Sequence, residues 1–417
     1  MASQGPVVIV DPYGPVKHLA EAFHSAGYDC LRVQSTADVP PLYRSSVIPA
    51  QVFSGTIIHS GDWAATLASV AAHNPAAVVP GGEVGVEFAD RLSESLGLPS
   101  NGTALSKARR DKYLMIETIK KAGLRGAQQL LVTSSEQLAA WHTRVGSRIV
   151  IKPIRSAGGD SIHFCDTQEE SVKAYLSILG SRNIFGQDND IALAQEYLPG
   201  AEYMVDTVSH DGRHYVSDMW RTTRICANDM IDLCCSLQII PPEGEIAGQL
   251  TGYAYQVLDA LGIRFGPAHV EIKLTPQGPA LVEAGARVAG GSIPSVARLS
   301  TGESQHEWTA RAYVRPEVFH DRRGEPYRIR RFCAIVALIS PVHGTLEGYC
   351  GLERIESLES FHSMHVSVRP GEQITRTIDD LTYPVVVTLA HDVEEVVYRD
   401  MNTIRYLDGP HFYRLAS

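Results

Sequence analysis

Short apolar runs alternate with amphipathic stretches through the first hundred residues. The apolar runs are typical of buried strands, and the stretches between them place their apolar side chains on one helical face. Strands that alternate with helices predict a parallel, doubly wound sheet. Ligands often bind at the carboxyl ends of such strands, here residues 11–14 and 80–83. We expect strands at residues 7–10, 29–33, 55–59 and 77–80, and helices at residues 18–26, 62–73 and 87–96.

The pattern changes after this first part. One helix is expected over residues 106–122, and the chain from 203 to 240 is rich in strand-forming residues. The last hundred residues predict a smaller α+β module. The expected architecture is therefore α/β and α+β. It consists of an N-terminal α/β domain at 1–108, a core at 109–318 with a subdomain at about 128–198, and a C-terminal module at 319–417.

Composition and charge exclude several classes of protein. Of the 417 residues, 44% are hydrophobic and 20% charged, which is ordinary for a globular protein. The formal charge of −10 disfavours a nucleic-acid partner, and no apolar run is long enough to span a membrane. The seven cysteines are odd in number and form no CxxC pair. We therefore expect reduced cysteines and a cytoplasmic protein.

A hairpin over residues 269–285 carries two acidic residues. With a turn at 276–278, position 275 would pair with 279, 273 with 281, and Glu271 with Glu283. Two carboxylates about 4 Å apart repel by roughly 4 kcal/mol at an effective dielectric near 20. A cation between them would relieve this repulsion, and hard oxygen ligands suit Mg²⁺. The alternative is two solvated acids on an edge hairpin.

Arg287 follows this hairpin and precedes the small residues Gly290, Gly291 and Ser292. A fixed guanidinium beside a metal site can grip a carboxylate or a phosphoryl group through two hydrogen bonds. The three small residues would leave room for a substrate side chain. The alternative is a surface arginine before a loose loop.

Two further segments are weaker candidates for phosphate and nucleotide binding. Lys152 ends a strand before a loop that contains Ser156, Gly158 and Gly159, and a cation beside flexible backbone donors is a recurrent phosphate site. No Walker A loop occurs in the chain. Residues 195–202 predict a strand, a kink and a second strand, whose backbone could bind an adenine edge. The alternative for that segment is a plain linker.

The order of these segments resembles the ATP-grasp superfamily. Lys112 in a helix is followed by Lys-Pro and a glycine loop, by Glu-Tyr-Leu-Pro-Gly-Ala-Glu at 196–202, and by the two hairpin carboxylates and Arg287. Pro-Gly-Gly-Glu at 80–83, Gly-Pro-Ala-His-Val-Glu at 266–271 and Leu-Val-Glu-Ala-Gly-Ala-Arg at 281–287 resemble the carboxylate–amine ligases of this superfamily. Within them the chain is similar to the L-amino acid ligases that make dipeptides.

The resemblance implies a role for each candidate residue. It also shows one departure, because Gly285 stands where the family often has an asparagine metal ligand, which leaves open whether one or two ions bind. The implied ATP ligands are Lys112, Lys152, Ser156, Gly158, Gly159, Glu196, Tyr197, Leu198 and Glu202; the metal ligands are Glu271 and Glu283; the substrate contacts are Glu83, His269, Arg287, Gly290, Gly291 and Ser292; and the catalytic residues are Arg287 and Lys152.

The resemblance further implies an ADP-forming ligase that uses ATP and Mg²⁺ or Mn²⁺. A substrate carboxylate would be phosphorylated to an acyl-phosphate, and an amine, expected to be that of a second amino acid, would then attack it. The partners would be small molecules, without nucleic acid or membrane, and a homodimer is left open. Two alternatives are a bicarbonate- or ribonucleotide-using ligase of the purine and biotin carboxylase branch and a non-catalytic ATP-binding protein.

Overall fold

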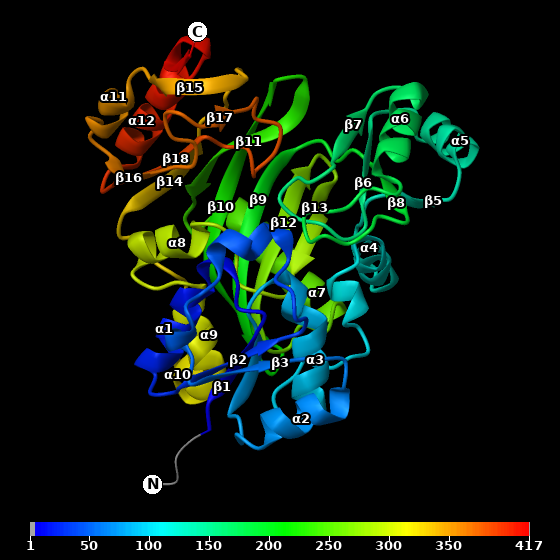
Figure 1. Ribbon diagram of the computed structural model, residues 1–417, viewed down its shortest axis with the longest axis vertical. Coiled ribbons are helices and arrows are strands. Elements are labelled where there is room, and N and C mark those ends of the chain that lie inside the picture. Colours follow the sequence, from blue (N-terminus) through cyan, green and yellow to red (C-terminus); the bar gives the residue numbers. More distant parts are fainter. Residues whose placement is uncertain (1–4, 417) are drawn as a thin grey trace.

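The structure is a computed structural model that describes residues 5–416. Its N-terminal part is the expected parallel sheet, with strand order β3-β2-β1-β4 (Figure 1). Short 3-10 turns η1 (Gly14–Val16), η2 (Pro41–Ser46), η3 (Ala50–Val52) and η4 (Glu83–Gly85) lie in its loops. The strands are β1 (Val7–Val10), β2 (Cys30–Gln34), β3 (Gly55–Ile58) and β4 (Ala77–Pro80), and the helices are α1 (Lys17–Ser25), α2 (Trp63–Ala71) and α3 (Val86–Ser95).

Strand β1 is apolar throughout because helices cover both faces of its sheet. Val7 and Ile9 belong to a cluster with Phe23 of α1, whereas Val8 and Val10 belong to a second cluster with Leu92 of α3. Successive side chains of a strand point to opposite faces, so an unbroken apolar run serves two cores.

The helix expected over residues 106–122 is broken into η5 (Lys107–Arg109) and α4 (Lys112–Lys121). Asp111 ends the first segment because its side chain accepts a hydrogen bond from the backbone N–H of Leu114 at 2.9 Å and caps α4. The break places Lys112 at the first position of α4.

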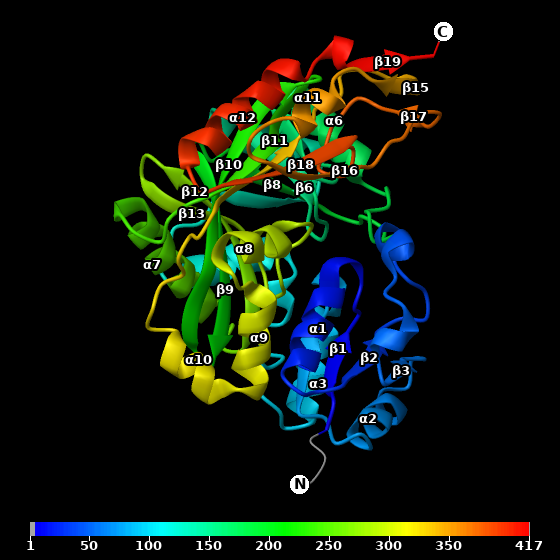
Figure 2. The ribbon, with the colours of Figure 1, turned by 90° about the vertical axis from the view of Figure 1, so that its left-hand side faces the viewer.

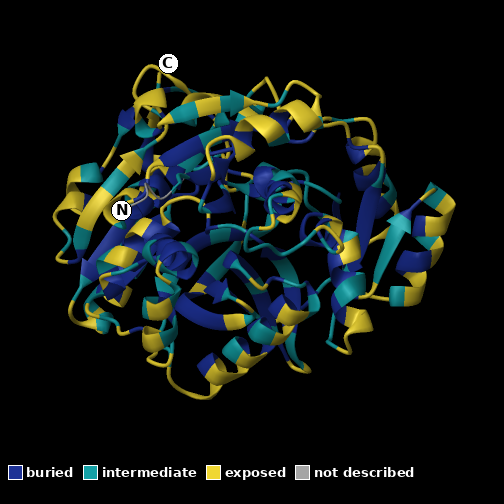
Figure 3. Cartoon of the chain, turned by 90° about the horizontal axis from the view of Figure 1, so that it is seen from below, coloured by how far each residue is buried: buried dark blue, intermediate teal, exposed yellow. Residues whose placement is uncertain are grey.

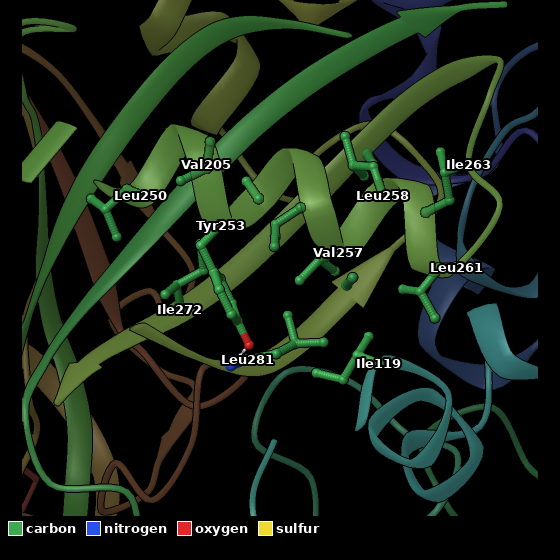
Figure 4. Close-up of a cluster of buried hydrophobic side chains, with 14 of the residues drawn as sticks. Ile119, Val205, Leu250, Tyr253, Val257, Leu258, Leu261, Ile263, Ile272 and Leu281 are labelled. Carbon is green, nitrogen blue, oxygen red and sulfur yellow. Dashed lines mark hydrogen bonds between the residues drawn. The ribbon is translucent and has the colours of Figure 1, made fainter. Parts of the chain in front are cut away.

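An eight-stranded sheet forms the centre of the molecule, with order β13-β12-β9-β10-β11-β14-β18-β16. Helix α7 (Glu245–Ala260) packs on one face through Leu250, Tyr253 and Val257, which meet Ile272 and Leu281 of the sheet (Figure 4). The strands are β9 (Ala201–His210), β10 (Arg213–Ala227), β11 (Met230–Ile239), β12 (Gly266–Thr275), β13 (Gly278–Gly285), β14 (Phe332–Ala337), β16 (Phe361–Val366) and β18 (Val385–His391).

A four-stranded antiparallel sheet of order β5-β8-β6-β7 lies beside the central sheet. Its own core includes Leu138, Trp141 and Tyr175, so it has the apolar contacts of a separate subdomain. We call residues 128–198 the lid. Its elements are β5 (Gln129–Val132), α5 (Ser135–Val145), β6 (Ile149–Pro153), β7 (His163–Cys165), α6 (Gln168–Ile178) and β8 (Ala192–Glu196).

The C-terminal strands β14, β18 and β16 extend the central sheet, because β14 pairs with β11 in antiparallel register. Figure 2 shows the C-terminal part of the chain in the upper part of the molecule, where β16 and β18 lie near β10 and β11. The helices within residues 5–416 include none with the length and hydropathy of a membrane span. Buried strands lie inside a shell of half-exposed helices (Figure 3). The other elements are α8 (Ile293–Thr301), α9 (Gln305–Val314), α10 (Pro316–Arg322), β15 (Gly344–Tyr349), α11 (Leu352–Glu356), β17 (Gln373–Ile374), α12 (Glu394–Leu407), η6 (Pro410–Phe412) and β19 (Tyr413–Leu415).

Candidate active site

The β12–β13 hairpin has a shorter turn than the sequence predicted. Thr275 pairs with Gly278, so the turn holds two residues and not three. The predicted pairs 275–279 and 273–281 are therefore wrong by one position: Leu274 pairs with Pro279, and Lys273 with Ala280.

A β-bulge between the turn and the acidic pair offsets this one-residue shift in register. The register changes between Ile272, which pairs with Leu281, and Glu271, which pairs with Glu283, so Val282 is an extra residue on β13. The predicted pairing of Glu271 with Glu283 is confirmed. A bulge that re-aims one side chain is a common feature beside active sites.

Each of these carboxylates has a cationic neighbour. Lys112 of α4 donates a hydrogen bond to Glu283 Oε1 at 2.6 Å, and His269 Nε2 lies 3.3 Å from Glu271 Oε1. Burial alone would raise the pKa of Glu271, but the hydrogen bond and charge of His269 lower it below its usual value. Both acids therefore face one another without the unrelieved repulsion expected of the bare pair.

Lys152 lies at the same place without a carboxylate partner of its own. Its side chain is buried, and among the described residues none accepts a hydrogen bond from its Nζ. Burial and the neighbouring charge of Lys112 lower the pKa of Lys152 to about 8. Two buried lysines side by side, with one left unpaired, favour an anionic ligand.

Arg287 is oriented from the N-terminal part. Glu83, directly after β4, accepts a hydrogen bond from Arg287 Nε at 3.0 Å and also pairs with Arg110. Burial would raise the pKa of Glu83, but Arg110 and Arg287 lower it to about 2. The expected substrate contact Glu83 is thus fully engaged by two arginines, and Arg110, which the sequence reasoning missed, had no motif to mark it.

Gly285 has a steric reason to replace the expected asparagine. A Cβ built at this position would lie 3.1 Å from Glu83 Oε2 and 3.2 Å from Arg287 Cζ. Any side chain would therefore push against the ion pair that holds Arg287.

The expected nucleotide residues occupy the junction of the lid and the central sheet. Glu202 is buried and pairs with Arg224, whose Nε lies 3.0 Å away, and its second oxygen lies 3.5 Å from Lys273 Nζ. The ring of Tyr197 lies 5.5 Å from the same ammonium. Leu198 packs in a small apolar cluster with Ala127.

Glu196, at the end of β8, is engaged within the lid itself. It accepts a hydrogen bond from the backbone N–H of Gln128 at 3.0 Å, which joins the two ends of the lid. The sequence reasoning missed Arg224 and Lys273. Lys273 could have been found, because it is two residues from Glu271 on the same strand face.

The glycine loop has the backbone that its sequence predicted. Gly158 and Gly159 have φ angles of 66° and 79°, a region that favours glycine, and Ser156 Oγ donates to Asp160 at 2.5 Å. Lys112 Nζ also donates to the carbonyl of Ser156 at 2.8 Å, which ties the loop to the two lysines.

The remaining expected substrate contacts differ in position. His269 is buried, with Nδ1 2.6 Å from Asp206 and Nε2 facing Glu271, so both ring nitrogens are engaged by protein carboxylates. Gly290, Gly291 and Ser292 are exposed, and no atom lies within 4 Å of a Cβ built on either glycine.

The donor set is suited to a hard divalent cation. Glu271 and Glu283 provide carboxylate oxygens on adjacent strands, and about a quarter of each side chain is exposed. Within residues 5–416 no three His, Cys, Asp or Glu side chains form a complete metal cage. Mg²⁺ needs no such cage, because it commonly takes one or two carboxylates and completes its shell with phosphates and water.

Comparisons with known proteins point to the reaction class that the sequence resemblance implied. Residues 145–295 match the family model described as the ATP-grasp domain. The chain is 31% identical over 415 residues to dapdiamide A synthase from Enterobacter agglomerans, covering 98% of this chain and 97% of that protein. It is 24% identical over 229 residues to alanine–anticapsin ligase from Bacillus subtilis, about half of each chain. The L-amino acid ligase structure from Bacillus licheniformis superposes with a TM-score of 0.75 at 17% identity, covering both chains completely.

The expected fold and reaction class are therefore confirmed. Opposed carboxylates on a hairpin, paired buried lysines and a fixed arginine occur in a chain that matches dapdiamide A synthase over nearly its full length. The protein belongs to the ATP-grasp superfamily and is one of its ATP-dependent carboxylate–amine ligases.

Proposed function

We propose that this enzyme joins two amino acids, or close derivatives of them, by phosphorylating the carboxylate of one with ATP and aminolysing the acyl-phosphate with the other. One observation supports the proposal most strongly. Lys152 is buried beside Lys112 and has no acceptor among the described residues, and it is close enough to Glu271 and Glu283 to feel their charges. Such a site is complete only with an anion, and the phosphates of ATP with their metal ions match its charges.

The lysines and Arg287 would neutralise charge as the phosphoryl group moves. Lys152 and Lys112 would bind the ATP phosphates, with the glycine loop of Gly158 and Gly159 over them. Glu271 and Glu283 would hold one or two Mg²⁺ or Mn²⁺ ions, which when bound supply charge neutralisation at the phosphoryl oxygens. Positioning and fixed charges account for most of the catalysis in such transfers.

Arg287 would hold the carboxyl group that is activated. Its Nε donates to Glu83 and its Nη1 to the carbonyl of Val288 at 3.1 Å, and no acceptor for Nη2 occurs in the part of the chain that the structure describes. The free Nη2 would bind the substrate carboxylate and then the oxyanion formed when the amine attacks. Glu83 and Arg110 would keep this guanidinium in place.

The amino acid substrates are inferred from the relatives dapdiamide A synthase and alanine–anticapsin ligase. The open space at Gly290 and Gly291, four residues or fewer beyond Arg287, supports a sizeable side chain on the carboxyl donor. We place the enzyme in the cytoplasm, acting on small molecules without a nucleic-acid or membrane partner. Its free cysteines and acidic charge are consistent with that placement.

A phosphate-release screen tests the proposal. The enzyme with ATP and Mg²⁺ is incubated with amino acids singly and in pairs, and phosphate and peptide are measured together. We expect release that requires a specific pair and yields one amide per phosphate. Release that requires bicarbonate, or ATP binding with no turnover for any pair, would contradict the proposal.

A further inference from the structure

A buried line of side chains connects Glu271 to the interior of the central sheet. His269 and Glu271 lie on the same face of β12, and Asp206 of β9 is directly opposite His269 in the ladder. The imidazole bridges the two acids, with Nδ1 2.6 Å from Asp206 Oδ1 and Nε2 3.3 Å from Glu271 Oε1. Asp206 is 1% exposed and His269 5% exposed, whereas about a quarter of the Glu271 side chain is exposed.

A second acid supports Asp206 from behind. Asp218 of β10 is the ladder partner of Asp206, and its carboxylate is fixed by Trp220 Nε1 at 2.6 Å and Ser217 Oγ at 2.8 Å. Burial and the charge of Asp206 raise the pKa of Asp218 well above its usual value. Asp206 Oδ2 is buried without a hydrogen-bond donor among the described side chains, and a protonated Asp218 is placed to supply one.

Burying these three charged groups lowers the stability of the fold. Buried ionisable groups lose several kcal/mol of hydration, and apolar residues of similar size often give equal or greater stability. The bridge reaches only one oxygen of Glu271. Within residues 5–416 no donor contacts the second oxygen, Oε2, so that oxygen remains available to a ligand.

We propose that Asp206 and His269 are positioning residues that hold Glu271 ready for the divalent metal. The inference rests on the proposed metal role of Glu271 and Glu283. His269 restrains the Glu271 carboxylate through Oε1 and leaves Oε2 for the ion, and Asp206 fixes the plane and donor direction of the imidazole. Partners of this kind, one step removed from the metal, typically change metal affinity 10- to 100-fold.

The proposal separates His269 from the substrate. The sequence resemblance implied a substrate contact, but the ring has no free nitrogen for one. A positioning role therefore predicts a defect in metal binding and not in the choice of amino acid.

Binding of Mn²⁺, followed by its electron paramagnetic resonance in the presence of ADP, tests this role without turnover. His269→Leu removes the donor at similar volume, and His269→Gln keeps an amide donor that can reach Glu271. We expect at least a tenfold loss of Mn²⁺ affinity in the leucine variant, a smaller loss in the glutamine variant, and unchanged ADP binding in EDTA for both. Raising Mg²⁺ should restore the kcat of the leucine variant.

Asp206→Asn provides an independent variant, with Asp90→Asn as its control. Asp90 is likewise a buried acid, paired with Arg109 at 2.8 Å in the N-terminal part. We expect Asp206→Asn to weaken Mn²⁺ binding at least tenfold and Asp90→Asn to lower only thermal stability. ADP binding in EDTA measures the folded fraction in each case.

Wild-type Mn²⁺ affinity in both His269→Leu and Asp206→Asn would overturn the positioning role. So would a loss of ADP binding in EDTA equal to the loss of metal binding. The proposed metal site itself is tested separately by Glu283→Gln, which should remove Mn²⁺ binding whether or not the buried line matters.

Discussion

At the scale of single residues, we expect the charge of Lys152 to be balanced by a bound anion. Lys152 has no hydrogen-bond acceptor within residues 5–416, and burial and the charge of Lys112 lower its pKa to about 8 from an ordinary 10.5. Between these two values the unfolded chain holds a proton that the folded protein has lost. The unfolded state therefore binds more protons, and this group makes stability rise with pH across that window.

ATP binding should reverse this shift. Phosphates favour the charged ammonium, so above pH 8 the enzyme should take up a proton as ATP binds, and ATP affinity should fall as the pH rises past 8. Lys152→Met should remove the proton uptake and weaken ATP binding at least tenfold, which is about 1.4 kcal/mol. Calorimetry at pH 9 in two buffers of different ionisation enthalpy measures both. Proton uptake that persists in the variant would assign the titration to another group, and Lys121→Met on the exposed end of α4 is the control.

Glu283→Gln should abolish the reaction while the fold persists. The substitution removes a charged metal ligand and also the acceptor of Lys112 at 2.6 Å. Repulsion from Glu271 is already offset by the flanking cations, so we expect a stability loss of about 1–2 kcal/mol and not a gain. ADP formation should fall more than a hundredfold. Near-normal turnover in Mg²⁺ would reject the metal assignment, and Glu347→Gln, which breaks only the exposed pair with Arg414, should change neither quantity.

At the scale of an element, the segment after β13 is where we propose that the side chain of the carboxyl donor lies. Gly291 has a φ of 58°, so a larger residue there would strain the backbone, whereas Gly290 has no such constraint and open space around its Cα. Gly290 is therefore the better position to test the pocket.

Gly290→Trp should keep activity with glycine or alanine as carboxyl donor and lose it with large donors. Added volume in a filled site typically costs 1–3 kcal/mol, or about 5- to 150-fold in kcat/KM. Rates over donors of increasing size measure the effect. An equal loss for every donor would mean that the segment serves the backbone alone. Gly324→Trp, at another glycine with open surroundings, is the matched control.

At the scale of the whole molecule, the lid contacts both the N-terminal domain and the C-terminal module. Its N-terminal contact is a hydrogen bond from the N–H of Leu42 to the carbonyl of Ile184 at 3.3 Å. Its C-terminal contact is the approach of Leu381 to the glycine loop, where a Cβ built on Gly158 would lie 3.7 Å from the leucine side chain. The C-terminal module therefore lies next to the glycine loop of the lid, although the sequence of the module carries no nucleotide-binding motif.

Leu381→Ser should weaken the packing of the C-terminal module against the glycine loop. We expect ATP with Mg²⁺ to protect residues 155–162 from hydrogen exchange in the wild type, and to protect them less in the variant, with a several-fold higher KM for ATP. Ile378→Ser is the control, since Ile378 is similarly exposed in the same loop (47% against 49%). Equal protection in both variants would exclude a role for this contact.

The sequence by itself determined the elements and the order of the site residues. Apolar runs marked β1 and β4, and alternation along residues 270–274 marked the strand that carries Glu271, because side-chain period follows directly from backbone geometry. The hairpin pattern and the neighbouring glycines marked the acidic pair, Arg287 and Lys152, and the family resemblance added Lys112. The opposition of Glu271 and Glu283 was also predicted, although from a turn one residue too long.

Tertiary structure decided what those residues touch. The bulge at Val282 offsets the shorter turn, Glu83 joins Arg110 to Arg287 across 204 residues of chain, and Asp206 meets His269 across 63. It also placed Gly285 close against the Glu83–Arg287 ion pair and turned His269 toward Asp206. Local pattern fixes which face a side chain takes on its own element, but contacts between distant segments depend on how the sheets and the lid pack, and no single stretch of sequence contains that information.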